Sequence, residues 1–203
     1  MPSREQTSSS VVIVLCHPNP GSFTHAAARA AASAAADAGH RVTLLDLYAE
    51  GFDPVMSADD LCRYQENDST VAHGTVAHVE AVRNADVLVF VYPPWWSGLP
   101  AVLKGWLDKV MVPGVAFSLD ERAKVRPGLT HVRRIVAVST YGSPRRYVRF
   151  VNDNGRRILF RALRMSTGWR ARTTFVGLYS MDTATAADRE RHLVRVADVM
   201  GSL

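Results

Sequence analysis

Five short runs of Val, Ile and Leu constrain the fold of this 203-residue chain more than any other feature of its sequence. Each run is nearly continuous rather than alternating, which is typical of a strand buried on both faces, as in a parallel sheet. Stretches with helical character separate the runs. The alternation of strand and helix predicts a doubly wound α/β architecture with helices on both faces of one sheet.

The expected elements follow from the pattern of apolar residues and from helix-ending signals. Strands are expected over residues 11–16, 42–47, 86–92, 134–140 and 173–178. Helices are expected over residues 24–38, 78–85, 100–112, 155–165 and 183–200. Gly39 is expected to end the first helix, and Asp182 or Thr183 to cap the last one. The strand order 2-1-3-4-5 is one of two common solutions for such a chain.

Composition favours one compact domain over residues 11–203, preceded by a disordered tail over residues 1–10. No apolar run approaches the length of about 18 residues that a membrane span needs. The polar start lacks the apolar segment of a signal peptide. Cys16 and Cys62 make neither a disulfide framework nor a metal cluster, so we expect a cytoplasmic protein without a metal.

Positive charge is concentrated in one part of the chain. Residues 122–172 hold 14 Lys or Arg and a single acid, Asp153, whereas the other residues carry a net charge of −8. Such a segment suits an anionic small molecule, or is simply a solvated arginine-rich surface. Neither a Cys/His finger nor an aromatic ribonucleoprotein pattern is present, so nucleic acid is not expected as a partner.

The predicted architecture places a ligand at the carboxyl ends of the strands. "HPNPGSFTH" follows the first strand there. Ser22 and Thr24 open a helix, whose first N–H groups and dipole suit a phosphate, and His17 adds a further donor. The alternative is plain N-capping by Ser22, with His17 as an ordinary loop residue.

"PPWWSG" follows the third strand and "YGSPRRY" the fourth. Trp106 belongs to the apolar stripe of the helix that follows, so we expect it in the core. Trp95 and Trp96 lie outside that stripe, which favours contact with a planar ring ligand. Alternatively, they cover the sheet edge or a subunit interface.

These segments resemble the NAD(P)H:quinone oxidoreductase branch of the flavodoxin-like flavoproteins. "HPNPGSFTH" is similar to the H-P-x-x-S-F-N motif, with Thr24 in place of Asn. The longer P-x-x-W-[FY]-x-x-P-x-x-L-K-x-W-x-[DE]-[KR]-V motif is matched at Pro93, Trp96, Pro100, Leu103, Lys104, Trp106, Asp108, Lys109 and Val110. The resemblance runs from about residue 11 to residue 147.

The resemblance implies a flavodoxin-like sheet of order 2-1-3-4-5 and a homodimer with a flavin at the subunit interface. It places His17, Ser22, Phe23 and Thr24 at the flavin phosphate end. Pro93, Pro94, Trp95, Trp96 and Ser97 would form a wall against the flavin ring, and Ser139, Thr140, Tyr141 and Gly142 would line its pyrimidine edge. Tyr147 would be the catalytic residue beside the ring.

Two positions depart from the family pattern. Tyr141 stands where the family has a glycine, so we expect the loop to change or the side chain to turn outward. The histidine that accompanies Tyr147 in the family falls at or near Asp153, which puts an assisted proton relay in question. Asp153 is expected to pair instead with neighbouring arginines.

The sequence thus predicts a flavin-dependent NAD(P)H oxidoreductase that reduces quinone-type acceptors by a ping-pong mechanism. The alternatives are a nitro- or azo-compound reductase, or a flavin-binding regulatory subunit of a membrane transporter with little turnover. FMN is slightly favoured over FAD, because the short tail leaves little room for an adenine. Arg145 and Arg146 are expected to bind the extra phosphate of NADPH.

Overall fold

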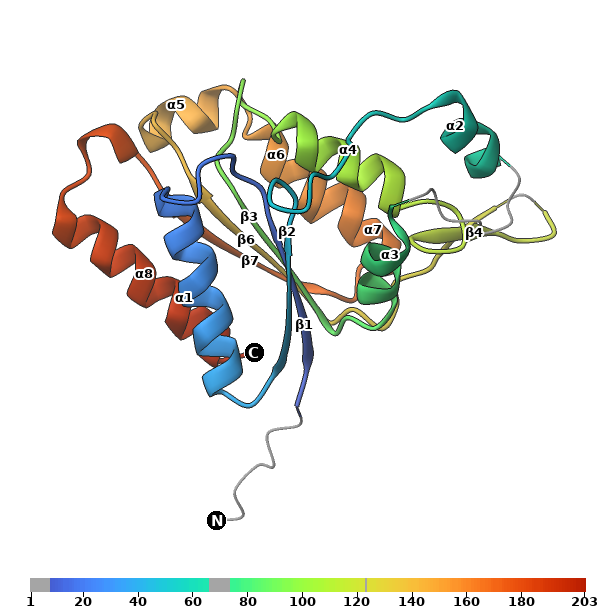
Figure 1. Ribbon diagram of the computed structural model, residues 1–203, viewed down its shortest axis with the longest axis horizontal. Coiled ribbons are helices and arrows are strands. Elements are labelled where there is room, and N and C mark those ends of the chain that lie inside the picture. Colours follow the sequence, from blue (N-terminus) through green and yellow to red (C-terminus); the bar gives the residue numbers. More distant parts are fainter. Residues whose placement is uncertain (1–7, 66–73, 123) are drawn as a thin grey trace, which may run out of the picture.

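The computed structural model describes residues 8–65, 74–122 and 124–203. Its main sheet has five parallel strands: β1 Ser10–Leu15, β2 Arg41–Asp46, β3 Val87–Tyr92, β6 Arg134–Thr140 and β7 Arg172–Leu178. The order across the sheet is β2-β1-β3-β6-β7 (Figure 1), which confirms the predicted flavodoxin-like order of 2-1-3-4-5. The tail expected over residues 1–10 lies outside the described residues as far as residue 7, and Ser10 already belongs to β1.

The helices alternate with these strands. They are α1 Phe23–Asp37, α2 Ala58–Gln65, α3 Val76–Arg83, α4 Ala101–Val110, α5 Arg145–Phe150, α6 Asn154–Arg157, the π-helix η1 Ile158–Leu163, α7 Arg164–Ser166, the 3-10 turn η2 Met181–Thr183, and α8 Ala186–Gly201. An antiparallel hairpin, β4 Phe117–Leu119 with β5 Val125–Pro127, stands apart from the sheet. None of the helices in the described ranges is both long and apolar enough to cross a membrane.

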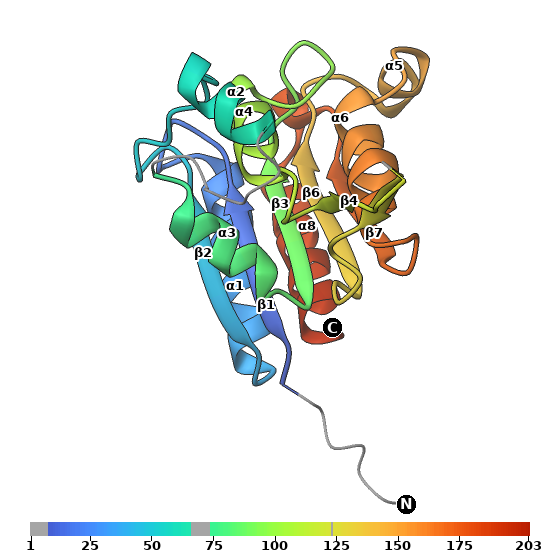
Figure 2. The same cartoon turned by 90° about the vertical axis from the view of Figure 1, so that its right-hand side faces the viewer.

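The two faces of the sheet bury different helices. Val11, Ile13 and Leu15 point to the face covered by α1 and α8, whereas Val12 and Val14 point to the face covered by α3 and α4 (Figures 1 and 2). Both sets are buried because successive side chains of a strand point to opposite faces. This is why the runs read as continuous rather than alternating.

Helix α1 packs closely on the sheet because its inner face is alanine. Ala27, Ala28, Ala31 and Ala35 are fully buried, and their spacing places them on one side of the helix. Alanine also has the highest helix propensity. Gly39 has a φ of +84° just beyond the helix, as predicted for its end.

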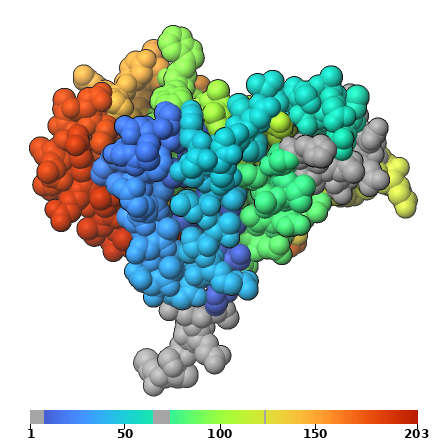
Figure 3. All heavy atoms as spheres, in the orientation of Figure 1, coloured from blue at the N-terminus to red at the C-terminus, as the bar shows by residue number. Residues whose placement is uncertain are grey.

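The parallel strands bring three connections to one end of the molecule. The β1–α1, β3–α4 and β6–α5 connections all leave the carboxyl edge of the sheet, and the β3–α4 connection projects beyond its surroundings (green, top of Figures 1 and 3). The strand order therefore assembles the three predicted segments, which are far apart in the sequence.

Candidate flavin site

The connection after β1 is a tight turn that leads into α1. The Nδ1 atom of His17 accepts a hydrogen bond from the N–H of Asn19 at 3.0 Å, and the Asn19 carbonyl accepts one from the N–H of Ser22 at 3.0 Å. Burial is the main cause that lowers the pKa of His17, which favours the neutral ring. The N–H groups of Phe23 and Thr24 have no acceptor among the described residues, so the helix start keeps two donors for a ligand.

Ser22 is the N-cap of α1, which was the alternative interpretation of this residue, and it also contacts a buried histidine. Its Oγ accepts the N–H of His25 at 3.2 Å and lies 3.0 Å from Nδ1 of the same residue. Nε2 of His25 lies 3.2 Å from Oδ2 of Asp46, at the end of β2. The side chain of Thr24 is buried, so this residue offers its backbone N–H rather than its hydroxyl.

The connection after β3 makes a strained two-residue turn. Trp96 and Ser97 have φ values of +50° and +57°, and the N–H of Gly98 donates to the carbonyl of Trp95 at 3.0 Å. Residues other than glycine adopt this left-handed backbone at a cost, and such residues cluster at functional sites. Trp96 is fully exposed at the tip, while the ring of Trp95 lies 6.4 Å from that of His17.

The connection after β6 is anchored on both sides, by hydrogen bonds to β7 and its following turn and to the end of β3. The Ser139 hydroxyl donates to the carbonyl of Tyr92 at 2.8 Å and is buried, so its side chain is not available to a ligand. The side chain of Tyr141 does not turn outward, which corrects that part of the expectation, and the residue does not have a positive φ. Its side chain points into the protein and is only 4% exposed, because Asp153 supplies a buried acceptor for its hydroxyl.

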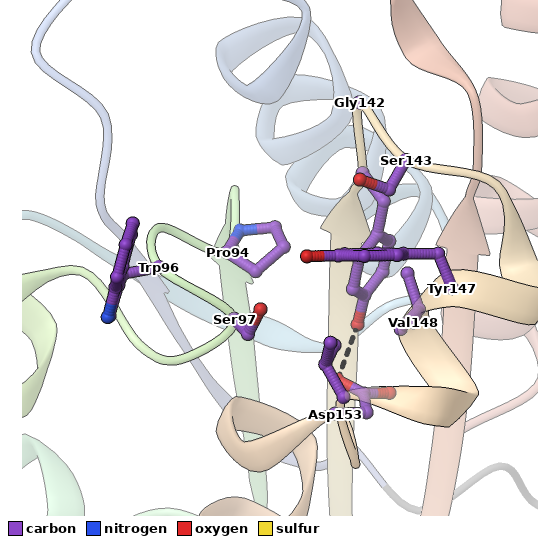
Figure 4. Close-up of a pocket in the computed structure, with 10 residues that line it drawn as sticks. Pro94, Trp96, Ser97, Gly142, Ser143, Tyr147, Val148 and Asp153 are labelled. Carbon is purple, nitrogen blue, oxygen red and sulfur yellow. Dashed lines mark hydrogen bonds between the residues drawn. The ribbon is translucent and has the colours of Figure 1, made fainter.

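One pocket joins the second and third connections. It has a cavity volume of about 240 Å³ and is lined by Pro94, Trp96, Ser97, Tyr141, Gly142, Ser143, Tyr147, Val148, Val151 and Asp153. Figure 4 shows Pro94 and Ser97 facing Tyr147 across it. Six of the predicted site residues thus share this pocket. Pro93, Trp95, Ser139 and Thr140 do not line it, and His17, Ser22, Phe23 and Thr24 belong to the neighbouring β1–α1 turn.

The short helix α5 supplies the remaining predicted residues. Tyr147 is half exposed and lines the pocket, whereas Arg145 and Arg146 are exposed on the first turn of α5 and do not line it. Sequence reasoning did not select Ser143, Val148 or Val151 as site residues. They follow predicted ones closely, but nothing in their residue types marks them as ligand contacts.

A second hollow lies beyond the end of β7, with a volume of about 380 Å³. Its lining includes Ser180, Arg191, His192 and Arg195. His192 is buried against Phe23, with ring centroids 5.8 Å apart, and neither of its ring nitrogens has a hydrogen-bond partner among the described residues. The preference for FMN rested on a lack of space after the fifth strand, and this hollow removes that reason.

Known proteins match the chain in both sequence and structure. A family model described as flavodoxin-like fold matches residues 9–198. NAD(P)H dehydrogenase (quinone) 1 of Cavia porcellus is 31% identical over 151 aligned positions, and the match covers 67% of this chain and 54% of that protein. The NAD(P)H:quinone oxidoreductase of Methanothermobacter marburgensis superposes with a TM-score of 0.80 at 26% identity, covering 96% of this chain and 98% of the other.

A more distant structure shares the fold. The FMN-dependent NADH-azoreductase of Bacillus anthracis, in complex with FMN, has a TM-score of 0.74 at 14% identity, over 95% of this chain and 97% of its own. The chain spans about half the length of the first curated relatives that it matches. The predicted motifs, the strand order and these matches agree, and the chain belongs to the flavodoxin-like family, with relatives named as NAD(P)H:quinone oxidoreductases.

Proposed function

We propose that this protein is a flavin-dependent NAD(P)H oxidoreductase that reduces quinone-type acceptors. The observation that carries the proposal is the pocket between the β3–α4 and β6–α5 connections, beside the open start of α1. Family membership and the names of the relatives support it. A ligand at the carboxyl edge of a doubly wound sheet is also the general rule for this architecture.

The residues present fit a flavin mononucleotide unit. The unpaired N–H groups of Phe23 and Thr24 would bind the phosphate, helped by the dipole of α1. The N–H groups of Gly142 and Ser143 also have no acceptor among the described residues and would serve the polar edge of the ring. Pro94, Trp96 and Ser97 would form the wall against the ring, with Pro94 and Trp96 as its apolar part.

A bound flavin would supply the two-electron chemistry between a nicotinamide and a quinone. This chain would contribute orientation and electrostatics. Backbone donors held in place beforehand stabilise negative charge at low cost, which is the role proposed for Gly142 and Ser143. Tyr147 and Trp96 would shield the reacting face from water. Donor and acceptor would use the same open face in turn, which produces ping-pong kinetics.

The choice between FMN and FAD as cofactor, and between NADPH and NADH as electron donor, belongs to the same proposal. FMN and FAD share the phosphate end, and the hollow beside His192 offers space for the adenylate part of FAD. Arg145 and Arg146 would favour NADPH over NADH by pairing with its extra phosphate. Because both arginines are exposed, we expect a modest preference, of roughly 10-fold or less in kcat/KM, that is lost in Arg145→Ala/Arg146→Ala.

The homodimer remains part of the proposal as well. Trp95, Trp96, Tyr147 and Phe150 expose large apolar side chains at the end of the molecule that carries the pocket. A second copy of the chain placed over this end would cover them and complete the ring site.

Flavin binding is the decisive experiment. The purified chain, freed of bound cofactor, should take up FMN or FAD and then oxidise NAD(P)H with a quinone, giving parallel double-reciprocal plots. Chromatography of the flavin extracted from the purified protein identifies the cofactor. A chain that binds neither flavin overturns the proposal, and one that binds flavin without turnover favours a regulatory subunit.

A further inference from the structure

The side chain of Tyr141 is held as firmly as any core residue, although it belongs to a loop at the candidate site. It is 4% exposed, and its ring stacks on that of Tyr179 with a centroid distance of 4.9 Å and an interplanar angle of 20°. Its N–H donates to the carbonyl of Leu178 at 2.8 Å, and its carbonyl accepts from the N–H of Met181 at 2.9 Å. The main chain of this residue therefore has its hydrogen bonds on the β7 side.

The hydroxyl of Tyr141 donates to Oδ1 of Asp153 at 2.9 Å, the bond drawn in Figure 4. Asp153 is also 4% exposed, and its Oδ2 lies 2.8 Å from Nε of Arg156, so it pairs with a neighbouring arginine as predicted. A buried carboxylate needs such partners, because an unpaired buried charge is strongly unfavourable. The loop after β6 is thereby tied to the segment before α6.

The backbone at Asp153 is unusual. Asn152 and Asp153 have φ values of +76° and +44°, so two consecutive residues other than glycine lie in the left-handed region. A backbone of this kind persists only where surrounding contacts fix it, and it is a reason to look for function. The hydrogen bond from Tyr141, the ion pair with Arg156 and a hydrogen bond from the N–H of Arg157 to the Asp153 carbonyl, at 3.2 Å, are the contacts that fix Asp153.

We propose that Asp153 is a positioning residue that acts through Tyr141, and that the pair fixes the backbone donors of Gly142 and Ser143 at the flavin ring. We refer to the Tyr141–Asp153 hydrogen bond as the latch. This inference rests on the proposed flavin site. It also gives one reason for both departures from the family pattern, because the tyrosine at position 141 and the carboxylate at position 153 are partners.

The latch acts on the segment that immediately follows it. Gly142 is next to Tyr141 in the chain, and the N–H groups of Gly142 and Ser143 have no acceptor among the described residues. The carbonyl of Ser143 accepts a hydrogen bond from the N–H of Ser180 at 3.1 Å. The turn is therefore held on one side by the residues after β7 and on the other by Asp153. Without the latch, the donors would lose their fixed orientation and bind a ring edge less well.

The test compares flavin affinities of the full-length chain by fluorescence quenching. FMN and riboflavin are both titrated, because riboflavin has the ring without the phosphate. The variants are Tyr141→Phe, Asp153→Ala, their combination and Asp153→Asn. Tyr179→Phe is the matched control, since it removes a hydroxyl from the stacked neighbour that has no hydrogen-bond partner among the described residues. Melting temperatures of the flavin-free proteins show that each variant is folded.

We expect Tyr141→Phe and Asp153→Ala each to weaken the binding of both flavins by about 5- to 10-fold, the effect of one lost hydrogen bond. The double variant should lose no more flavin affinity than Asp153→Ala alone, since Asp153→Ala already removes the bond to Tyr141. Asp153→Asn keeps an acceptor oxygen and should stay within about 2-fold of the wild type. At saturation, the visible absorption band of the bound flavin should shift toward that of free flavin in Tyr141→Phe and Asp153→Ala, but not in Tyr179→Phe.

Several results would overturn the latch. They are unchanged flavin affinity in Tyr141→Phe, additive losses in the double variant, or an equal loss and band shift in Tyr179→Phe. These outcomes leave flavin binding by the wild type intact, so they count against the latch alone. A wild-type chain that binds no flavin counts against both the latch and the proposed function.

Discussion

At the scale of single residues, Ser22 connects helix stability to ligand binding. Its Oγ accepts the N–H of His25, which satisfies a donor at the start of α1, and also contacts the His25 ring. When Nε2 of His25 donates to Asp46, Nδ1 is the acceptor and the Ser22 hydroxyl points to it. The backbone donors of Phe23 and Thr24, rather than this hydroxyl, are then left for a phosphate.

Two substitutions separate these roles of Ser22. Ser22→Ala should destabilise the protein by about 1 kcal/mol through loss of the N-cap, measured by urea denaturation. Ser22→Asp keeps a good N-cap, but it places a carboxylate near the proposed phosphate site. A like charge within ~4 Å costs about 1–4 kcal/mol, so FMN affinity should fall at least about 5-fold while riboflavin affinity is retained. Equal losses for FMN and riboflavin would contradict the placement of the phosphate.

His192 makes the stability of the protein depend on pH. Burial, with a smaller contribution from Arg195, lowers the pKa of His192 to about 4. In the unfolded chain a histidine has a pKa of about 6.5, so between these values the unfolded state binds more protons. The stability is therefore fully present above about pH 6.5 and is lost as the pH falls toward 4.

The expected loss from His192 is at most about 3 kcal/mol. Urea denaturation of the wild type and of His192→Leu between pH 7 and pH 4 measures it. The variant should show a shallower decline, because it has no proton to take up at this position. Parallel curves for the two proteins would contradict the assignment.

At the scale of elements, Gly105 determines how closely α4 approaches the chain before α2. A Cβ atom at this position would lie 2.2 Å from the carbonyl oxygen of Pro54, which is backbone and has little room to move. Gly201, near the end of α8, has no atom within 4 Å of the same added carbon. The two helical glycines thus form a natural pair, one crowded and one open.

Gly105→Ala should destabilise the protein by roughly 1–3 kcal/mol through overpacking, in spite of the higher helix propensity of alanine. Gly201→Ala should be neutral or slightly stabilising, because it gains propensity without a clash. Thermal or urea denaturation of both variants tests this. If both substitutions have the same effect, the contact with Pro54 does not determine the position of α4.

The sequence predicted the elements of the sheet better than those around it. All five strands lie within a residue of the predicted ranges. β1, β3 and β6 are buried on both faces and are therefore apolar almost throughout, whereas the edge strands β2 and β7 are only partly buried. The hairpin β4–β5 and the helices α2 and α5 were not predicted. They are short and largely exposed, so their sequences lack the buried apolar runs from which the other elements were predicted.

The helix caps and the hydrogen-bond partners of individual side chains were also hard to predict. The cap of α8 is Thr185, not Asp182 or Thr183, because Thr185 forms a capping box with Asp188 three residues on. Tyr141 was expected to turn outward or to change the loop. Its hydrogen bond to Asp153 was not predicted, because the two residues are 12 positions apart and meet only when α5 folds back. The motifs identified the connections that form the candidate site, but not which side chains would pair with one another.

At the scale of the whole molecule, the exposed aromatic side chains at the pocket end lead to a prediction about assembly. Sedimentation should give a mass near twice 22.3 kDa, and Trp96→Ser should shift the protein toward the monomer. Trp169→Ser is the control, because Trp169 is also exposed but precedes β7, at the amino edge of the sheet. An active monomer, or equal effects of the two substitutions, would contradict a dimer formed through the pocket end.

The order of strands also has a consequence for the chain during synthesis. β1 pairs with β2 on one side and with β3 on the other, but 46 residues separate the end of β2 from the end of β3. At about 5–20 residues per second, a ribosome takes roughly 2–9 s to supply that second partner. Until then one edge of β1 has unpaired backbone N–H and C=O groups, with which other chains can pair. We therefore expect the nascent β1–β2 unit to be more prone to pairing with other chains than the complete sheet.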